Sequence, residues 1–131
     1  MANYYGVGRS NYVRVKDEEA FTAALAPFEV EIIHDDEGRV GIIDASGDGA
    51  GFSWYAFDTD DPVEVQPDDL LGPHLQDGEV MILVEAGHVK HRYVIGYALA
   101  FNNKREFEYI DLDQIVKQAQ HLGANITLPR T

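Results

Sequence analysis

The sequence predicts an α+β domain in which a largely antiparallel sheet of about six to seven strands carries two main helices and one short helix. Three observations favour this class: strand-like alternation fills most of the chain, short turns join neighbouring strands, and helical periodicity is confined to three segments. A chain of 131 residues with 45% apolar content is long enough for one domain, residues 1–131, with an ordinary hydrophobic core.

Three helices are predicted from periodicity and capping signals. One begins at Asp17, a favourable N-cap, and closes at Pro27. A shorter one spans Asp68 to Leu75, where three leucines share a face. Near the carboxyl end, between a capping Asp111 and a terminating Gly123, apolar residues recur at steps of three and four, which predicts an amphipathic helix that packs on one side: Leu112, Ile115, Val116, Ala119 and Leu122.

Strands are predicted between these helices. They cover residues 12–16, both sides of the turn at 35–38, residues 51–57, both halves of a hairpin at 79–103, and residues 105–110. In the second half of the long hairpin, large residues alternate with small ones, so one face holds Tyr93, Ile95, Tyr97, Leu99 and Phe101 and the other holds Val94, Gly96, Ala98 and Ala100. We expect the small-residue face to let a helix approach closely.

Charge is distributed very unevenly along the chain. The net charge is −13, yet residues 1–16 hold three bases and no acid, and residues 80–131 hold six bases and five acids. Residues 17–79 hold 18 acids and a single base, Arg39. Six acids lie within residues 57–69, where Pro62 and Pro67 are expected to keep the chain extended and out of a helix.

The sequence contains no signal for several classes of covalent, membrane-spanning or catalytic feature. There is no cysteine, which excludes disulfides, thiol catalysis and cysteine-based zinc sites. The amino end lacks the pattern of a secretory leader and no apolar run is long enough to span a membrane, so a cytoplasmic location is expected. Ser10, Ser46 and Ser53 lie outside any nucleophile-elbow pattern, and paired carboxylates are uninformative among so many acids. In the absence of a specific catalytic signal we expect a protein that is not an enzyme, with no cofactor and no metal, and a small hydrolase is the third interpretation.

Some groups of residues have an alternative interpretation as a site for phosphate, calcium, a transition metal or nucleic acid. The glycine-rich segment 47–51 is interpreted as a flexible loop rather than a phosphate cradle, because no Lys-Ser or Lys-Thr follows it. Calcium bound by Asp44 with Asp48, or by the acids of 58–61, remains an alternative without the usual loop spacing. His88 and His91 flank a hairpin tip, where two imidazoles can bind a transition metal, but no third ligand is evident and both are interpreted as solvated. The aromatic and basic residues of 4–16 could stack on nucleic acid, but the acidic middle would repel a polyanion.

The acidic middle is the most informative feature for function. Duplex DNA presents roughly 21 charges over the ~36 Å expected for a domain of this size, and the middle segment holds 18 acids. A surface that imitates the charge of DNA is therefore a hypothesis, beside the simpler interpretations of a solvated surface or of salt adaptation. The candidate partner-binding residues are Asp35, Asp36, Glu37, Asp58, Asp60, Asp61, Glu64, Asp68 and Asp69.

A resemblance adds to this hypothesis. The segments "YYGVGRSNYVRVKDEEAF" and "LQDGEVMILVEAGHVKHRYVIGYALAFN" resemble a family of short uncharacterised proteins of plasmids, prophages and other mobile elements. As a class, small acidic products of such elements are similar to anti-CRISPR and anti-restriction proteins, several of which imitate DNA. The resemblance brings no site residues with it. Together with the acidic middle, it predicts a non-enzymatic inhibitor that occupies a basic, nucleic-acid-binding surface of a host defence complex such as a CRISPR surveillance complex, without binding nucleic acid or membrane itself. The alternative is a protein-binding module or oligomer subunit of a mobile element, with no connection to nucleic acid and contacts made by the aromatic strands.

Overall fold

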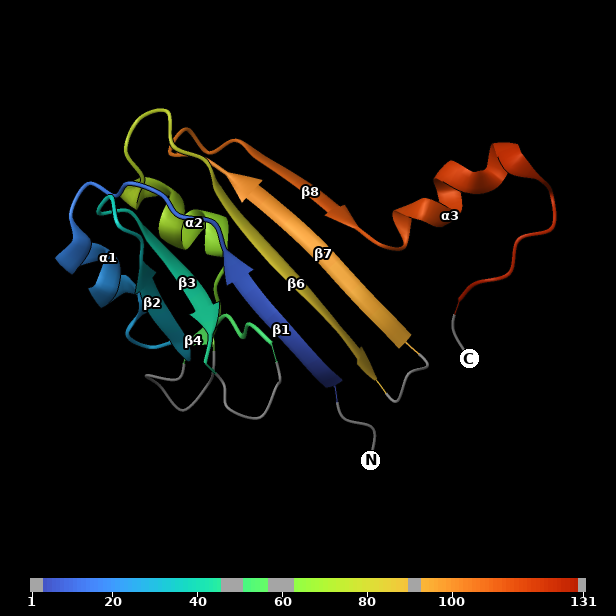
Figure 1. Cartoon of the computed structure of the whole chain (residues 1–131), viewed down its shortest axis with the longest axis horizontal. Coiled ribbons are helices and arrows are strands. Elements are labelled where there is room, and N and C mark those ends of the chain that lie inside the picture. Colours follow the sequence, from blue (N-terminus) through green and yellow to red (C-terminus); the bar gives the residue numbers. More distant parts are fainter. Residues whose placement is uncertain (1–3, 46–50, 57–62, 90–92, 130–131) are drawn as a thin grey trace.

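The fold is an α+β domain built on a six-stranded antiparallel sheet, which confirms the predicted class. A computed structural model describes residues 4–45, 51–56, 63–89 and 93–129. The strand order in the sheet is β2-β3-β1-β6-β7-β8, and a small two-stranded ribbon is formed by β4 and β5. Figure 1 shows β2, α1 and α2 at one end of the molecule and α3 beyond the other end.

The elements follow one another in an order close to the predicted one. The strands are β1 (Tyr4–Ser10), β2 (Val30–His34), β3 (Val40–Asp44), β4 (Tyr55–Ala56), β5 (Val63–Glu64), β6 (Met81–Val89), β7 (Tyr93–Phe101) and β8 (Phe107–Asp111). The helices are α1 (Glu18–Leu25), α2 (Pro67–Leu71) and α3 (Gln114–Gln118), and α2 and α3 continue as the 3₁₀ turns η1 (Gly72–His74) and η2 (Ala119–Leu122).

One side of the sheet carries the hydrophobic core. There α1 contributes Phe21 and Leu25, α2 contributes Leu71, and the sheet contributes alternate residues of its central strands. Because the side-chain period of a strand is two, Met81 and Leu83 of β6 are buried on this side, together with Phe101 of β7, the partner of Met81. The fully packed positions are Val13, Phe21, Leu25, Val40, Ile42, Leu71, Leu75, Met81, Leu83 and Phe101.

The opposite side of the sheet is apolar but no helix of the described residues lies on it. We call this side the back face. In β1 and β6–β8 the register assigns to it the charged or titratable residues Arg9, His88 and Glu108 and the apolar residues Tyr5, Val7, Ile82, Val84, Ala86, Val94, Gly96, Ala98, Ala100, Ile110 and Leu112. The expectation that a helix approaches the small residues of β7 is therefore wrong within this chain. The helices α1 and α2 cover the core side instead, where large residues such as Leu99 and Phe101 complete the core.

One helical N-terminus and two hairpins form as predicted. Asp17 caps α1, because its Oδ1 accepts a hydrogen bond of 3.0 Å from the backbone N–H of Glu19. The β2–β3 hairpin turns through Gly38, whose φ of +77° suits glycine. The β6–β7 hairpin pairs all nine residues of each strand.

The first strand lies earlier than predicted. The expected strand at 12–16 makes only single bridges, Val13 to Val40 and Val15 to Leu75, whereas β1 spans Tyr4–Ser10. Its glycines concealed it, since glycine weakens a strand signal. The structure gives one of them a reason: a Cβ added to Gly8 would lie 2.5 Å from a ring carbon of Phe52. Glycine therefore lets that aromatic ring lie against the sheet.

The region 51–69 differs from the prediction in two ways. The strand expected at 51–57 is limited, among the described residues, to the pair Tyr55–Ala56, which faces Val63–Glu64. Pro67 does not keep the following residues extended: it is the first residue of α2, where a missing N–H costs nothing because the first turn has no acceptor for it. Asp68 and Asp69 therefore lie in the first turn of a helix, where carboxylates are favourable.

The carboxyl-terminal helix is shorter and more exposed than predicted. Its N-cap is Asp113 and not the expected Asp111, which ends β8 and whose Oδ1 accepts a bond of 3.2 Å from the N–H of Gln114. After five α-helical residues the chain tightens into η2 and ends at Gly123. No residue of α3 or η2 is buried, so the expected packing of this helix is not made within the chain. We call residues 113–129 the C-terminal arm.

Replacing Phe21 tests the assignment of the core. This ring is fully buried at the centre of the cluster, so we expect Phe21→Ala to lower the free energy of unfolding by about 3–5 kcal/mol. Urea denaturation followed by circular dichroism measures the change. Phe107→Ala is the control, because that ring is mostly exposed, and a cost below about 1 kcal/mol is expected. Equal costs at the two positions would contradict the assignment.

Candidate functional site

The structure separates the predicted acids into three locations. Asp35, Asp36 and Glu37 form the turn between β2 and β3, Glu64 ends β5, and the pair Asp68 and Asp69 begins α2. The remaining candidates, Asp58, Asp60 and Asp61, lie outside the described residues, and so does the alternative calcium ligand Asp48.

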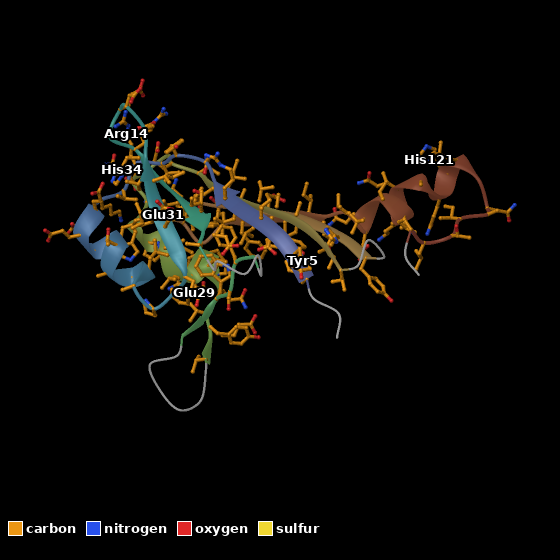
Figure 2. All side chains as sticks on the ribbon, turned by 60° about the horizontal axis from the view of Figure 1, so that its bottom comes forward. Tyr5, Arg14, Glu29, Glu31, His34 and His121 are labelled. Atoms are coloured by element: carbon orange, nitrogen blue, oxygen red, sulfur yellow. The ribbon has the colours of Figure 1, made fainter. Side chains whose placement is uncertain are left out.

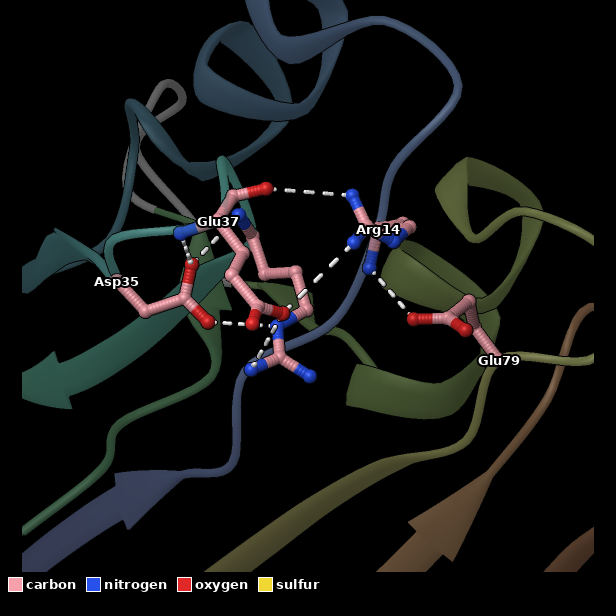
Figure 3. Close-up of polar contacts among 5 residues, drawn as sticks. Arg14, Asp35, Glu37 and Glu79 are labelled. Atoms are coloured by element: carbon pink, nitrogen blue, oxygen red, sulfur yellow. Dashed lines mark hydrogen bonds and ion pairs between the residues drawn. The ribbon is translucent and has the colours of Figure 1, made fainter.

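The β2–β3 turn is held together by its own ion pairs (Figure 3). Asp35 accepts hydrogen bonds from the backbone N–H groups of Glu37 and Arg39 at 3.0 and 2.9 Å, and its Oδ2 lies 2.6 Å from Nε of Arg39. Arg39 Nη2 also lies 3.4 Å from a carboxylate oxygen of Glu37. Two acids of the turn are therefore already paired, and Asp36 is the member with no ion pair to a described residue.

A base from the amino-terminal segment also reaches this turn. Arg14 Nη1 donates a bond of 3.3 Å to the backbone carbonyl of Glu37, and its Nη2 lies 4.0 Å from the Glu37 carboxylate. The backbone N–H of Arg14 donates to Glu79 at 2.7 Å, so Arg14 lies between the two glutamates (Figure 3). The turn is thus a less complete anionic surface than the sequence suggested.

A different location gathers predicted acids and aromatic rings in one groove. The groove has a volume of about 530 Å³ on the core side of β7 and β8. Three of its lining residues carry carboxylates, Glu64, Asp68 and Asp69, and four carry aromatic rings. The full lining is Trp54, Glu64, Val65, Gln66, Pro67, Asp68, Asp69, Tyr97, Leu99, Phe107 and Tyr109. We call it the aromatic-acidic groove.

Strand pairing builds one wall of the groove. The β7–β8 register places Leu99 opposite Tyr109, and the rings of Tyr97 and Tyr109 stack with centroids 6.0 Å apart. Because residues two apart in a strand face the same way, Phe107 continues this wall beyond Tyr109. The wall is therefore a fixed aromatic surface carried by two long strands.

The segment before α2 builds the other wall. The N–H of Val65 donates to the carbonyl of Trp54 at 2.7 Å, which ties the acidic segment to the tryptophan. The Trp54 ring stacks on Phe52 at a centroid distance of 5.5 Å and contacts Phe28 at 5.4 Å. Its Nε1 is buried and donates to no acceptor among the described residues. A buried donor without an acceptor costs free energy.

The two tyrosines of the groove are neutral at physiological pH. Burial, and then the nearby carboxylate of Glu85, raises the pKa of Tyr97 above its usual value. Burial, followed by Asp111, raises the pKa of Tyr109 as well. Both hydroxyls are already engaged, Tyr97 with Glu85 and Tyr109 with Asp111, so the groove offers ring faces beside the carboxylates, which alone carry its charge. Rings and carboxylates together suit the side chains of lysine and arginine.

The acids of α2 also border a second, more polar hollow. This hollow of about 260 Å³ is lined by Asp68, Asp69, Asn102, Asn103 and Arg105 together with Gly72 and Pro73. Arg105 has a φ of +64°, an uncommon backbone conformation for a residue with a side chain. A base therefore lies on this side of α2, while the aromatic-acidic groove has no base in its lining.

A buried glutamate that the sequence analysis did not single out positions the groove. Glu85 is 8% exposed on the core side of β6 and accepts hydrogen bonds from the hydroxyl groups of Tyr4 at 2.8 Å and Tyr97 at 3.3 Å. It also accepts the backbone N–H of Phe52 at 2.8 Å, two residues before Trp54. Its position in step with Met81 and Leu83 was the available signal, because an acid at a core position needs partners. The described residues contain no cluster of three metal-ligating side chains.

The ion pair between Asp35 and Arg39 predicts how the stability of the fold changes with pH. Desolvation raises the pKa of Asp35, but hydrogen bonds from the backbone and side chain of Arg39 outweigh it and leave this pKa below its usual value. A carboxyl group with a lowered folded-state pKa stabilises the fold above its unfolded-state pKa of about 4 and loses that contribution as pH falls through the folded-state value. We expect the stability difference between the wild type and Asp35→Asn to be full at neutral pH and to shrink in acid. Urea unfolding from pH 7 to pH 2 measures it, and a difference that stays constant would refute the assignment.

A second prediction concerns Glu85. Glu85→Ala leaves two tyrosine hydroxyls and the Phe52 N–H without their acceptor, so we expect a loss of about 1–3 kcal/mol of unfolding free energy. Glu108→Ala, on an exposed position of β8, is the matched control and should change stability by less than about 0.5 kcal/mol. Chemical denaturation of both variants decides between a positioning role and a dispensable one.

Comparisons of the chain with protein-family models, with curated proteins and with solved structures each returned no match. In the part of the chain that the structure describes, no helix combines the length and apolar character needed to cross a bilayer. Function is therefore inferred from the geometry and charge of the described residues, above all from the aromatic-acidic groove.

Proposed function

We propose that this protein is a non-enzymatic binding protein that takes lysine and arginine side chains of a basic, nucleic-acid-binding protein surface into the aromatic-acidic groove, and so keeps nucleic acid from that surface. One observation carries the proposal: Glu64, Asp68 and Asp69, three of the acids that the sequence suggested for partner binding, line one groove together with four aromatic rings.

The chemistry of the groove favours a cationic side chain over other ligands. A guanidinium or ammonium group is attracted by the face of a tryptophan or tyrosine, worth ~0.5–2 kcal/mol, and forms charge-assisted hydrogen bonds with carboxylates. Arginine suits both at once, because its planar group stacks on rings and donates in a fork. The volume of about 530 Å³ lies within the roughly 300–1,000 Å³ typical of ligand sites, enough for one or two long side chains.

The distribution of charge supports a basic protein as the partner. The segment 17–79, with 18 acids and one base, includes β2, β3, α1 and α2, which gather at one end of the molecule in Figure 1. The acids Glu29 and Glu31 at the edge strand β2 are both exposed, and Figure 2 shows them on that end. Such a surface attracts basic partners from a distance and repels polyanions.

The resemblance to proteins of mobile elements directs the proposal toward a particular target class. A host defence complex such as a CRISPR surveillance complex holds nucleic acid in a channel lined by lysine and arginine. An acidic protein bound in that channel competes with nucleic acid without any chemical step. The groove would take individual basic side chains of the channel, and the surrounding acids would supply the attraction at longer range.

Charge reversal in the groove tests the proposal. The probe is a fluorescently labelled arginine-rich peptide, and its binding is measured by anisotropy at about 50 and 300 mM salt. We expect the variant Glu64→Lys with Asp69→Lys to weaken binding on the order of 10- to 100-fold, because both a charge and a groove contact are lost. Tyr109→Leu should also weaken binding. The ratio of wild-type to variant affinity should be larger at 300 mM than at 50 mM salt, because salt screens contacts between charges more than contacts with rings.

The matched control alters the same charge elsewhere. Glu29→Lys with Glu31→Lys changes the net charge by the same amount at exposed positions outside the groove, so only a few-fold loss is expected. Equal losses in the two double variants would mean that bulk charge and not the groove binds the peptide. For the inhibitory role, a phage targeted by CRISPR should regain plaque formation in cells that express the wild type and not in cells that express the groove variant. If the wild type binds the peptide but leaves CRISPR immunity unaltered, the proposed defence target is wrong and the binding function of the groove stands.

A further inference from the structure

Two apolar surfaces have no partner among the described residues, and they lie largely on the part of the chain that is nearly neutral. One is the back face of the sheet and the other is the C-terminal arm, residues 113–129. Both belong largely to residues 80–131, where six bases meet five acids. Neither surface takes part in the aromatic-acidic groove, which opens on the core side of β7 and β8.

The back face is continuous across four strands. Strand register places Val7 of β1 next to Ala86 of β6 and then Gly96 of β7, and the adjacent row runs from Val84 through Ala98 to Ile110 of β8. Val7 is 76% exposed and Ile110 is 60% exposed. Between them the small residues leave a shallow hollow of about 250 Å³ that is lined by apolar side chains from three strands and by Leu112. A face of this extent on a sheet is typical of a protein contact surface.

The arm carries the complementary shape. Ile115 is 58% exposed and Leu122 is 78% exposed, and Ile126 and Leu128 are exposed farther along. The helix α3 has five residues and is followed by one 3₁₀ turn. Helices this short are marginal in water without tertiary contacts, so an exposed α3 needs a surface to pack on. The large aliphatic side chains of the arm match the small-residue rows of the back face.

The arm is directed away from its own sheet. Figure 1 shows α3 beyond the end of β8, and Figure 2, in which His121 marks the arm, shows the same from another side. The backbone fixes this exit: the N–H of Leu112 still bonds to Gly96 in the sheet, and the next turn is closed by bonds from Ile115 to Leu112 and from Val116 to Asp113. To cover its own back face, the chain would have to reverse within residues 111–113.

We propose that the back face binds the C-terminal arm of a second copy of this chain, and that two copies exchange arms about a twofold axis. Each copy then supplies one arm and one face, so the contact is reciprocal and closed, as twofold interfaces are. The exchange buries both unpartnered surfaces at once, which a partner binding only the face or only the arm does not do.

Size and charge agree with this arrangement. The arm of 17 residues and the 11 apolar residues of the back face amount to about 28 residues on each side, near the roughly 20–30 of a standard stable interface. The contact lies largely on the nearly neutral part of each chain, so the contacting residues themselves add little charge repulsion.

The first experiment measures mass in solution for the full chain. Light scattering after size-exclusion chromatography at about 50 µM should give twice the chain mass of 14.6 kDa. Ile115→Glu and Leu122→Glu should each raise the dimer dissociation constant on the order of 100-fold or more, because a carboxylate would be buried without a partner. Since both positions are exposed in the single chain, their variants should keep the folded circular dichroism spectrum. Ala98→Glu on the back face should have the same effect from the other side of the contact.

The control is an equally exposed apolar residue outside both surfaces. Val63→Glu on β5 should leave the dimer intact. A monomeric wild type at 50 µM overturns the proposal, and so does a dimer that tolerates Ile115→Glu, Leu122→Glu and Ala98→Glu.

Cysteine cross-linking then identifies the occupant of the face. Because the chain has no cysteine, Ala98→Cys and Ile115→Cys can be introduced cleanly, each in a separate chain. Mixing the two single variants and oxidising them should give a disulfide-linked product of two chains, more than either variant gives alone. If the double variant instead closes a disulfide within a monomer, the arm folds onto its own sheet and the exchange is refuted. Binding of wild-type monomer to vesicles of neutral phospholipid, with no dimer, would assign the face to a lipid surface and would also refute it.

Discussion

The antiparallel pairing of β6 with β7 is the constraint on which the other features of this molecule depend. All nine residues of β6 face all nine of β7, so the alternation of one strand is transmitted to the next without a break. Met81 and Leu83 point into the core with Phe101, and the residues between them point to the back face. A shift of one residue in this register would move the apolar core set to the other side of the sheet. The core, the groove wall and the uncovered face are therefore three results of one pairing.

The same alternation explains why a charged residue is buried near the middle of the sheet. Position 85 is in step with Met81 and Leu83, and its carboxylate is satisfied by two tyrosine hydroxyls and a backbone N–H. These bonds tie β1, β7 and the segment before Trp54 to β6. A buried acid gives little net stability unless all its partners are present, but a complete set fixes one arrangement of those partners. Glu85 therefore places the indole of the groove, although it does not line the groove itself.

Several elements could be predicted because their signals are local. The N-cap at Asp17, the turn at Gly38 and the alternation of the long hairpin each depend on a few neighbouring residues. Strand β1 was placed too late because the glycines that weaken a strand signal are required by a ring that arrives from residue 52. That contact joins segments far apart in the chain, and no local pattern contains it.

For the candidate site, too, some features could be predicted from local signals and others depend on contacts between distant segments. The excess of acids was visible in the sequence, but which of them are available depends on tertiary contacts. Arg14 comes from outside the acidic middle and pairs with Glu37, whereas Glu64 and Asp69 meet aromatic rings from β7 and β8. Pro67 shows a further limit: it was expected to prevent a helix and in fact begins one, because proline is unfavourable inside a helix and favourable at its first position.

The two sides of β7 carry different surfaces, and this affects how many sites of a target one arm-exchanged pair would bind. Tyr97 and Leu99 face the groove, while Ala98 and Ala100 face the other way. In an arm-exchanged pair the two grooves would open outward and be carried at a fixed separation on one rigid body. A target that presents two suitably spaced clusters of basic side chains would then be held by both, with the second contact made at a high effective concentration. Weak individual grooves would suffice for slow release, and occupancy would depend sharply on the spacing of the target's sites.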